Sequence, residues 1–199
     1  MQKKVLVAYA TNSGSTAEVA DAVGEELRKC GMVADVCRLT LVPSVEAYSA
    51  VVVAAPMILG WHGEAGSFIK KHQQALSKMP VAYLFTAMSL TRPRDAKLNG
   101  VPVLVDPNLA HDPKNPSRPG LRDRYATVGR YLGPALRAAP SVRPVSVGFF
   151  AGKLDFGRLK LPQLLFVMLI IQAKPGDRRN WKAIRGWAAS LSTSFAGPA

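Results

Sequence analysis

The sequence predicts an α/β protein with a doubly wound parallel sheet. Short apolar runs recur along the chain, and segments with helical periodicity separate them. The first run, Val5 to Ala8, has no polar alternation, which is typical of a strand that is buried on both faces. At 199 residues and 48% hydrophobic content, the chain is long enough for a single domain, residues 1–199, with a full core. We therefore expect right-handed crossovers and helices on both faces of the sheet.

The first strand leads into a polar turn, Thr11-Asn12-Ser13-Gly14-Ser15-Thr16. Apolar residues then recur every three or four positions from Val19 to Cys30, which predicts a helix that ends at Gly31. Backbone N–H groups at the helix start and the hydroxyls of the turn favour a bound phosphate. No lysine or arginine lies between Tyr9 and Glu18, so we expect neutral donors rather than a Walker-type loop. The alternative is an ordinary capped helix start.

This turn resembles the flavodoxin-type loop for the phosphate of flavin mononucleotide (FMN). The pattern of that loop, Thr/Ser-x-Thr/Ser-Gly-x-Thr, is matched by Thr11, Ser13, Gly14 and Thr16. The resemblance implies FMN as the cofactor. It also implies a flavodoxin-like sheet of five parallel strands in the order 2-1-3-4-5.

Four more strands and three more helices complete the predicted fold. The strands span Val33 to Leu39, Ala50 to Ala55, Val81 to Phe85 and Val142 to Phe150. The helices span Glu64 to Leu76, Leu121 to Ala138 and Lys182 to Ser192. Each helix carries apolar residues at helical spacing on one face, which predicts that this face packs on the sheet.

Ligands of such sheets bind beyond the carboxyl ends of the strands. Three loops, 10–16, 56–63 and 86 onward, are therefore expected to meet at one site. Trp61 or His62 is expected to lie against the flavin ring; the alternatives are a core or helix-capping role for Trp61 and a surface position for His62. The predicted cofactor contacts are Thr11, Asn12, Ser13, Gly14, Ser15, Thr16, Pro56, Met57, Ile58, Leu59, Gly60, Trp61, His62, Thr86, Ala87, Met88 and Ser89.

A proline-rich insert, Ala87 to Gly120, follows the fourth strand. Loops longer than about 12–15 residues without regular structure are uncommon unless they are functional or disordered. The insert leaves the sheet beside the predicted flavin, so it is expected to form a wall of a substrate pocket, and Val101 to Val105 to add a short strand. Its candidate substrate-binding residues are Arg92, Arg94 and Lys97. The alternative is a disordered insert without a catalytic role.

A second appended segment, residues 158–174, precedes the last helix and predicts one extra helix. Its uncharged run from Leu161 to Ala173 has thirteen residues, fewer than the roughly 20 needed to cross a bilayer. Such a run between cations suits peripheral attachment to an anionic membrane, and the alternatives are a buried helix or a dimer interface. The flanking cations are Arg158, Lys160, Lys174, Arg178 and Arg179.

The charge of the chain is one-sided. Of the formal net charge of +13, residues 101–199 supply +10, with 15 Lys/Arg against 5 Asp/Glu. This asymmetry favours anionic partners such as lipid head groups or acidic small molecules. Cys30 and Cys37 are expected to be reduced core residues, and no signal peptide or metal-ligand spacing is recognised. We therefore expect a cytoplasmic protein on the inner face of the cell membrane, without a metal.

Further along, the chain is similar to the menaquinone-dependent protoporphyrinogen oxidases, flavodoxin-type enzymes of haem biosynthesis. The similarity lies in Gly60-Trp61-His62, Phe68 to His72, Met79-Pro80 and Phe149 to Leu154. It implies an FMN-dependent oxidoreductase that oxidises a porphyrinogen and passes electrons to a membrane quinone. The similarity identifies no catalytic residue. Pro56 and Met57 depart from smaller or polar residues common in that family, and the insert looks longer than usual.

Other functions are compatible with the same motifs. A flavodoxin-like electron carrier would have no organic substrate, although such carriers are usually acidic. An NAD(P)H:quinone reductase would differ in its electron donor. A flavodoxin-fold protein without flavin would use its basic half on another partner. Nucleic acid is not expected as a partner, and a homo-oligomer is compatible with the sequence.

Overall fold

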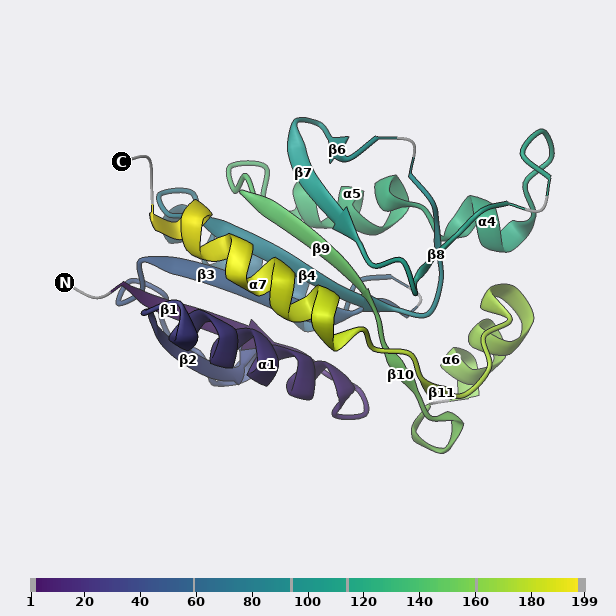
Figure 1. Ribbon diagram of the computed structural model, residues 1–199, viewed down its shortest axis with the longest axis horizontal. Coiled ribbons are helices and arrows are strands. Elements are labelled where there is room, and N and C mark those ends of the chain that lie inside the picture. Colours follow the sequence, from purple (N-terminus) through teal and green to yellow (C-terminus); the bar gives the residue numbers. More distant parts are fainter. Residues whose placement is uncertain (1–2, 59, 94, 114, 160, 197–199) are drawn as a thin grey trace.

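The computed structural model describes residues 3–58, 60–93, 95–113, 115–159 and 161–196. Its central sheet has the strand order β2-β1-β3-β4-β9-β7-β6 (Figure 1). These strands are β1 (Lys4–Tyr9), β2 (Val33–Arg38), β3 (Ala50–Pro56), β4 (Val81–Ala87), β6 (Lys97–Leu98), β7 (Val101–Val105) and β9 (Ser146–Ala151). The α/β class and the predicted order 2-1-3-4-5 are confirmed, with β9 as the fifth strand.

The prediction of only five strands is wrong, because the insert extends the sheet. Strand β7 pairs in parallel with β9, and β6 pairs antiparallel with β7. Without β7, the outer side of β9 would expose unpaired backbone groups as an edge. The short strand expected at Val101 to Val105 is present. The insert also contains β5 (Leu90–Thr91), which pairs with β8 (Ala110–His111).

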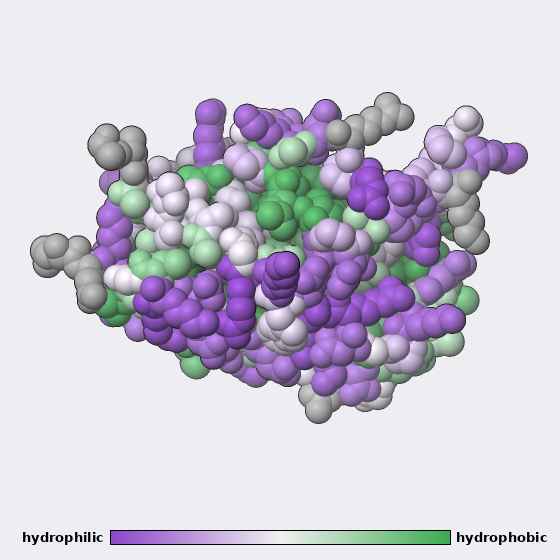
Figure 2. All heavy atoms as spheres, in the orientation of Figure 1, coloured by the Kyte–Doolittle hydropathy of each residue, from purple (hydrophilic) through white to green (hydrophobic). Residues whose placement is uncertain are grey.

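Helices cover both faces of the sheet. Helices α1 (Ser15–Lys29) and α7 (Trp181–Ala196) lie on one face and bury a cluster that includes Val23 and Trp187 (Figure 1). Helices α2 (Gly63–Lys71), α3 (Gln73–Leu76) and α5 (Val128–Ala138) contribute to the second cluster. On the first face, hydrophobic surface remains visible over β7 and β9, where Leu104 is 39% exposed (Figure 2).

Several predicted boundaries are wrong for local reasons. The helix expected from Leu121 to Ala138 is divided into α4 (Leu121–Tyr125) and α5, because the Thr127 hydroxyl accepts the Arg130 N–H and caps a new helix. The helix expected from Glu64 to Leu76 is divided at His72 into α2 and α3. The fifth strand begins at Ser146 rather than Val142, since Pro144 has no N–H for a ladder.

The segment after β9 is a hairpin that projects from the sheet (Figure 1). Strand β10 (Lys153–Leu154) pairs antiparallel with β11 (Gly176–Asp177) at its base. Between them lie the 3₁₀ turn η2 (Phe156–Arg158), helix α6 (Leu161–Phe166) and the π-helical turn η3 (Val167–Ile171). The predicted extra helix is therefore present as α6 and η3. Among the described residues, no helix has the length and apolar character needed to cross a bilayer.

Two expectations about individual side chains are wrong. Cys30 is exposed at the end of α1 rather than in the core, while Cys37 is partly buried; both are free. Arg179 was expected beside lipid head groups, but its side chain is only 5% exposed and pairs with Asp177 and Glu18. Lys160 lies outside the described residues, and the side chain of Arg158 is not described.

Candidate functional site

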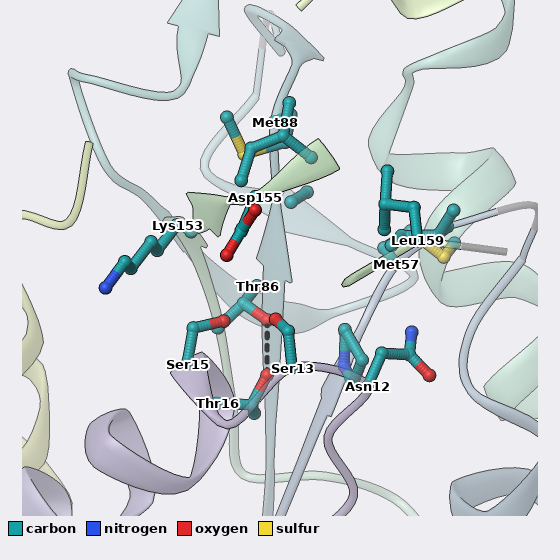
Figure 3. Close-up of a pocket in the computed structure, with 15 residues that line it drawn as sticks. Asn12, Ser13, Ser15, Thr16, Met57, Thr86, Met88, Lys153, Asp155 and Leu159 are labelled. Carbon is teal, nitrogen blue, oxygen red and sulfur yellow. Dashed lines mark hydrogen bonds between the residues drawn. The ribbon is translucent and has the colours of Figure 1, made fainter. Parts of the chain in front are cut away.

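A pocket lies where the carboxyl ends of β1, β3, β4 and β9 meet (Figure 3). The space between its lining side chains, open solvent at its mouth included, is about 430 Å³. Its lining residues are Asn12, Ser13, Ser15, Thr16, Pro56, Met57, Ile58, Thr86, Ala87, Met88, Gly152, Lys153, Leu154, Asp155 and Leu159. Ten of these belong to the predicted set of cofactor contacts, and five do not.

The polar end of the pocket is built by the turn between β1 and α1. Gly14 is the N-cap of α1 and has φ of +90°, a conformation in which a side chain would be strained. Its N–H donates to the Thr11 hydroxyl at 2.9 Å, so Thr11 closes the turn instead of lining the pocket. The first turn of α1 therefore begins at the pocket wall, with the positive end of its dipole there.

Hydroxyl groups gather at this end of the pocket. The Thr16 and Thr86 side-chain oxygens lie 2.9 Å apart, and this buried hydrogen bond joins α1 to the end of β4. The hydroxyls of Ser13 and Ser15 lie beside the same bond (Figure 3). Several neutral donors next to a helix start are the chemistry that binds a phosphate.

The other part of the pocket is apolar. Met57, Met88 and Leu159 line it, and Met57 and Leu159 lie together on one side (Figure 3). A pocket with hydroxyl donors at one end and flexible apolar side chains at the other fits a planar ring that carries a phosphate. The donor set therefore fits FMN, with the phosphate at the turn and the ring beside the apolar residues.

Trp61 and His62 are close to this pocket without lining it. The Trp61 ring packs on Phe85 and Tyr83, with ring centroids 4.7 and 5.3 Å apart. Trp61 is thus partly buried and packs against the core, and its contact with the flavin ring stays a prediction. His62 Nε2 lies 3.2 Å from Asn12 Oδ1, so this residue links the loop after β3 to the phosphate turn. Gly60 and Ser89 do not line the pocket, and Leu59 lies outside the described residues.

The residues that the sequence reasoning missed follow β9. Gly152, Lys153, Leu154 and Asp155 come directly after this strand, and Asp155 points into the pocket (Figure 3). Lys153 adds a cation to a site that was expected to have neutral donors only. The rule that ligands bind at carboxyl ends of strands would have found them, because β9 is the neighbour of β4. This rule does not point to Leu159, which lies further along the chain and does not directly follow a strand of the central sheet.

The buried carboxylate of Asp106 stabilises the backbone just before the pocket residues that follow β9. Asp106, at the end of β7, has no exposed surface. Its carboxylate accepts hydrogen bonds from Ala151 N at 3.1 Å, Asn180 Nδ2 at 3.0 Å and Asn108 N at 3.0 Å. Ala151 immediately precedes the pocket residue Gly152. The insert therefore lines the pocket with Ala87 and Met88 and also supports it through the buried Asp106 side chain. That the insert forms a wall of a substrate pocket stays a prediction.

The candidate substrate residues of the insert lie elsewhere. Arg92 Nε is 2.9 Å from Asp112 Oδ1, and both side chains are exposed. Lys97 lies on β6, three strands away from β4. Neither lines the pocket, and Arg94 lies outside the described residues. Substrate binding by these three residues stays a prediction.

A hydrogen-bonded chain runs from the end of β4 into the insert. Ser89 Oγ lies 3.3 Å from His111 Nδ1, and His111 Nε2 lies 2.9 Å from Asp123 Oδ1. Burial acts to raise the pKa of Asp123, but hydrogen bonds from His111 and the Gly120 N–H outweigh it and lower the pKa. Asp123 is therefore held as a carboxylate beside the imidazole.

Comparisons with known proteins agree with this architecture. A family model for the flavodoxin domain matches residues 6–180. Protoporphyrinogen IX dehydrogenase (quinone) of Escherichia coli strain K12 is 32% identical over 93 residues, which cover 45% of this chain and 51% of that protein. The chain thus spans about half the length of the curated relatives it matches.

Solved structures give weaker likenesses. An oxidoreductase from Corynebacterium diphtheriae has 17% identity and a TM-score of 0.49, with 100% of this chain and 99% of that chain covered. A Fusobacterium nucleatum flavodoxin mutant bound to FMN has 16% identity and a TM-score of 0.31, with 43% and 53% covered. Membership of a family is therefore shown by the family model and not by these structures. Because this model covers most of the sequence, the chain belongs to the flavodoxin family, and its pocket fits flavin mononucleotide.

Proposed function

We propose that this protein is an FMN-dependent oxidoreductase that oxidises protoporphyrinogen IX, or a similar reduced substrate, and passes the electrons to a quinone. Family membership and the pocket support the flavin-dependent redox class. FMN as the cofactor is supported by the hydroxyl cluster around the 2.9 Å Thr16–Thr86 hydrogen bond, beside the start of α1. The partial similarity to the dehydrogenase of Escherichia coli supports the substrate and the quinone.

In this proposal the chain binds the phosphate of FMN, orients the flavin and shields its ring from water. The first turn of α1 and the hydroxyls of Ser13, Ser15 and Thr86 hold the phosphate. Met57, Met88 and Leu159 exclude water from the ring. FMN supplies two-electron chemistry, which repeated oxidation of one substrate requires. Lys153, which is exposed at the pocket, contributes positive charge that favours anionic ligands.

We also propose that the projecting hairpin attaches the protein peripherally to an anionic membrane. Four of its apolar side chains are between 48% and 67% exposed, which is unusual for a helix of a water-soluble protein. They are Leu161, Leu165, Met168 and Leu169. Lys174 and Arg178 follow in the same hairpin and are exposed, so cations lie beside the apolar face. Such attachment would bring the site close to a quinone dissolved in the membrane.

The proposed oxidation is tested under anaerobic conditions. Protoporphyrinogen IX is added to the FMN-loaded protein, and a menaquinone analogue in lipid vesicles follows. The proposal predicts loss of the absorbance of the oxidised flavin after the porphyrinogen is added and its recovery after the quinone is added. A flavin that binds but stays oxidised would contradict the substrate and leave the cofactor intact.

An electron carrier or an NAD(P)H:quinone reductase is the second candidate, favoured by membership of the flavodoxin family alone. Anaerobic NAD(P)H discriminates between the donors. Bleaching by NAD(P)H, but not by the porphyrinogen, would favour the reductase. Bleaching by neither, with exchange of electrons only with another redox protein, would favour the carrier.

A further inference from the structure

A second cavity separates the insert from the projecting hairpin. It is an open groove with a volume of about 410 Å³. Arg118 of the insert and Arg122 and Asp123 of α4 lie on one side, and Leu169 and Ile170 of η3, followed by Gln172, lie opposite. The groove shares none of its lining residues with the pocket at the ends of β1, β3, β4 and β9. Its volume lies within the range of about 300–1,000 Å³ typical of small-molecule sites.

The two arginines of the groove are poorly neutralised. Within the described ranges of the chain, the Arg118 guanidinium has no carboxylate partner. Arg122 Nε lies 3.8 Å from Asp123 Oδ1, beyond hydrogen-bond distance. Asp123 instead accepts from His111 and from the Gly120 N–H. The groove therefore keeps a net positive charge even with Asp123 counted.

The opposite wall is apolar and exposed. Leu169 is 67% exposed, although it faces a groove large enough for a ligand to cover it. Tyr125 of α4 packs edge-on against Phe166 of α6, with centroids 4.9 Å apart, and this contact holds the two walls together. The groove thus presents cations on one side and an uncovered hydrocarbon surface on the other.

Both walls of the groove originate at the FMN-type pocket. The insert leaves the sheet after Met88, and the hairpin passes Leu159; both residues line that pocket. The chain of Ser89, His111 and Asp123 runs from the residue after Met88 into the groove. A molecule held in the groove is therefore next to the elements that enclose the cofactor.

We propose that this groove binds the acid groups of an apolar, carboxylate-bearing substrate, with Arg118 and Arg122 as the carboxylate-binding residues and η3 as the apolar wall. The inference rests on the proposed function and deepens it. Arginine pairs with carboxylates through several directed N–H groups, and a partly buried pair is stronger than an exposed one. This assignment replaces the outlying cations Arg92 and Lys97, of which one is already paired with Asp112 and the other lies on β6.

The test is equilibrium binding, so that it does not depend on turnover. Protoporphyrin IX and its dimethyl ester, which lacks free carboxylates, are titrated into the FMN-loaded full chain, and porphyrin fluorescence is followed. We expect the diacid to bind roughly tenfold more tightly than the diester. The double variant R118Q/R122Q is expected to remove this preference and to leave diester binding unchanged.

Arg124→Gln is the matched control. Arg124 lies on the same short helix as Arg122 and is exposed, but it does not line the groove. The control should keep the full preference for the diacid, as should K97Q. The FMN content of each variant checks its folding. If the double variant does not fold, Arg118→Glu alone is used, because Arg118 is exposed and its side chain has no partner among the described residues.

Three results would overturn the inference. The first is an equal affinity of the wild type for diacid and diester. The second is a preference that survives R118Q/R122Q, or one that K97Q abolishes. The third is a double variant that loses binding to phosphatidylglycerol vesicles while its porphyrin binding is unchanged, which would identify the groove as a lipid site. Failure of the proposed function is recognised separately, as a flavin that protoporphyrinogen IX does not bleach while the diacid preference persists.

Discussion

The two sides of the FMN-type pocket are built in different ways. The side of β1, β3 and β4 consists of strands that are buried almost throughout, and its polar groups come from one continuous turn, residues 11–16. The outer side consists of the insert and the projecting hairpin, which expose apolar and cationic side chains and are held by a few long-range contacts. The cofactor end is therefore built from buried strands and one local turn of the sequence. The end proposed for substrate and membrane is appended and depends on distant residues.

Truncation of a buried core side chain should have the largest effect on the free energy of unfolding. Phe149 is fully buried on β9 and stacks on Phe85 with centroids 4.7 Å apart. Phe149→Ala is expected to lower the free energy of unfolding by about 3–5 kcal/mol, because it removes buried area and leaves a cavity. Urea denaturation measures this value. A loss below about 1 kcal/mol would mean that the core in this region is loose.

Asp106 joins the two sides, so its replacement should affect both. Asp106→Asn places an amide N–H against backbone or side-chain donors and leaves at least one buried donor without an acceptor. We expect a loss of about 1–3 kcal/mol in stability and weaker FMN binding, measured by denaturation and by flavin fluorescence. Asp112→Asn, in an exposed acid of the same insert, is the control. Equal effects of the two variants would contradict the role of Asp106 in supporting the pocket.

Asp123 of α4 should make the stability of the fold depend on pH. Its pKa is lowered in the folded chain, so its contribution to stability is present above the unfolded pKa of about 3.9 and is lost as the pH falls through the folded pKa. Asp123→Asn is expected to cost about 1 kcal/mol at neutral pH, from the lost hydrogen bonds. The difference between wild type and variant should shrink below about pH 4. A difference that grows in acid would contradict the assigned direction of the shift.

The projecting hairpin should tolerate substitutions with the smallest effect on stability. Leu165 and Met168 are 48% and 51% exposed and do not line the groove, so L165S/M168S should change the free energy of unfolding by less than about 0.5 kcal/mol per site. Binding to phosphatidylglycerol vesicles, measured by sedimentation, should fall severalfold because apolar area no longer enters the interface. Ile184→Ser, on the buried face of α7, is the contrasting variant that should destabilise the fold.

The sequence allowed much of the inner side to be predicted and little of the outer side. Periodicity located β1, β3, β4 and the phosphate turn because each depends on neighbouring residues. The contribution of Asp106 was not predictable, since its partners Ala151 and Asn180 lie 45 and 74 positions away. The packing of Trp61 on Phe85 has no local signal either, so the sequence left open whether Trp61 meets the flavin or the core. A short strand at Val101 to Val105 was predicted, but its pairing with β9 and the addition of β6 beside it were not, because a single sequence does not specify which strands pair.

The measurement that tests the central account most directly compares FMN with riboflavin, which lacks the phosphate. Both are titrated into the apoprotein of the wild type and of Thr16→Val, which has the same shape but no hydroxyl to meet Thr86. The account predicts that the wild type prefers FMN by at least about tenfold and that Thr16→Val reduces this preference, with Thr193→Val as an exposed control. Equal affinity of the wild type for FMN and riboflavin would contradict a phosphate site at residues 11–16.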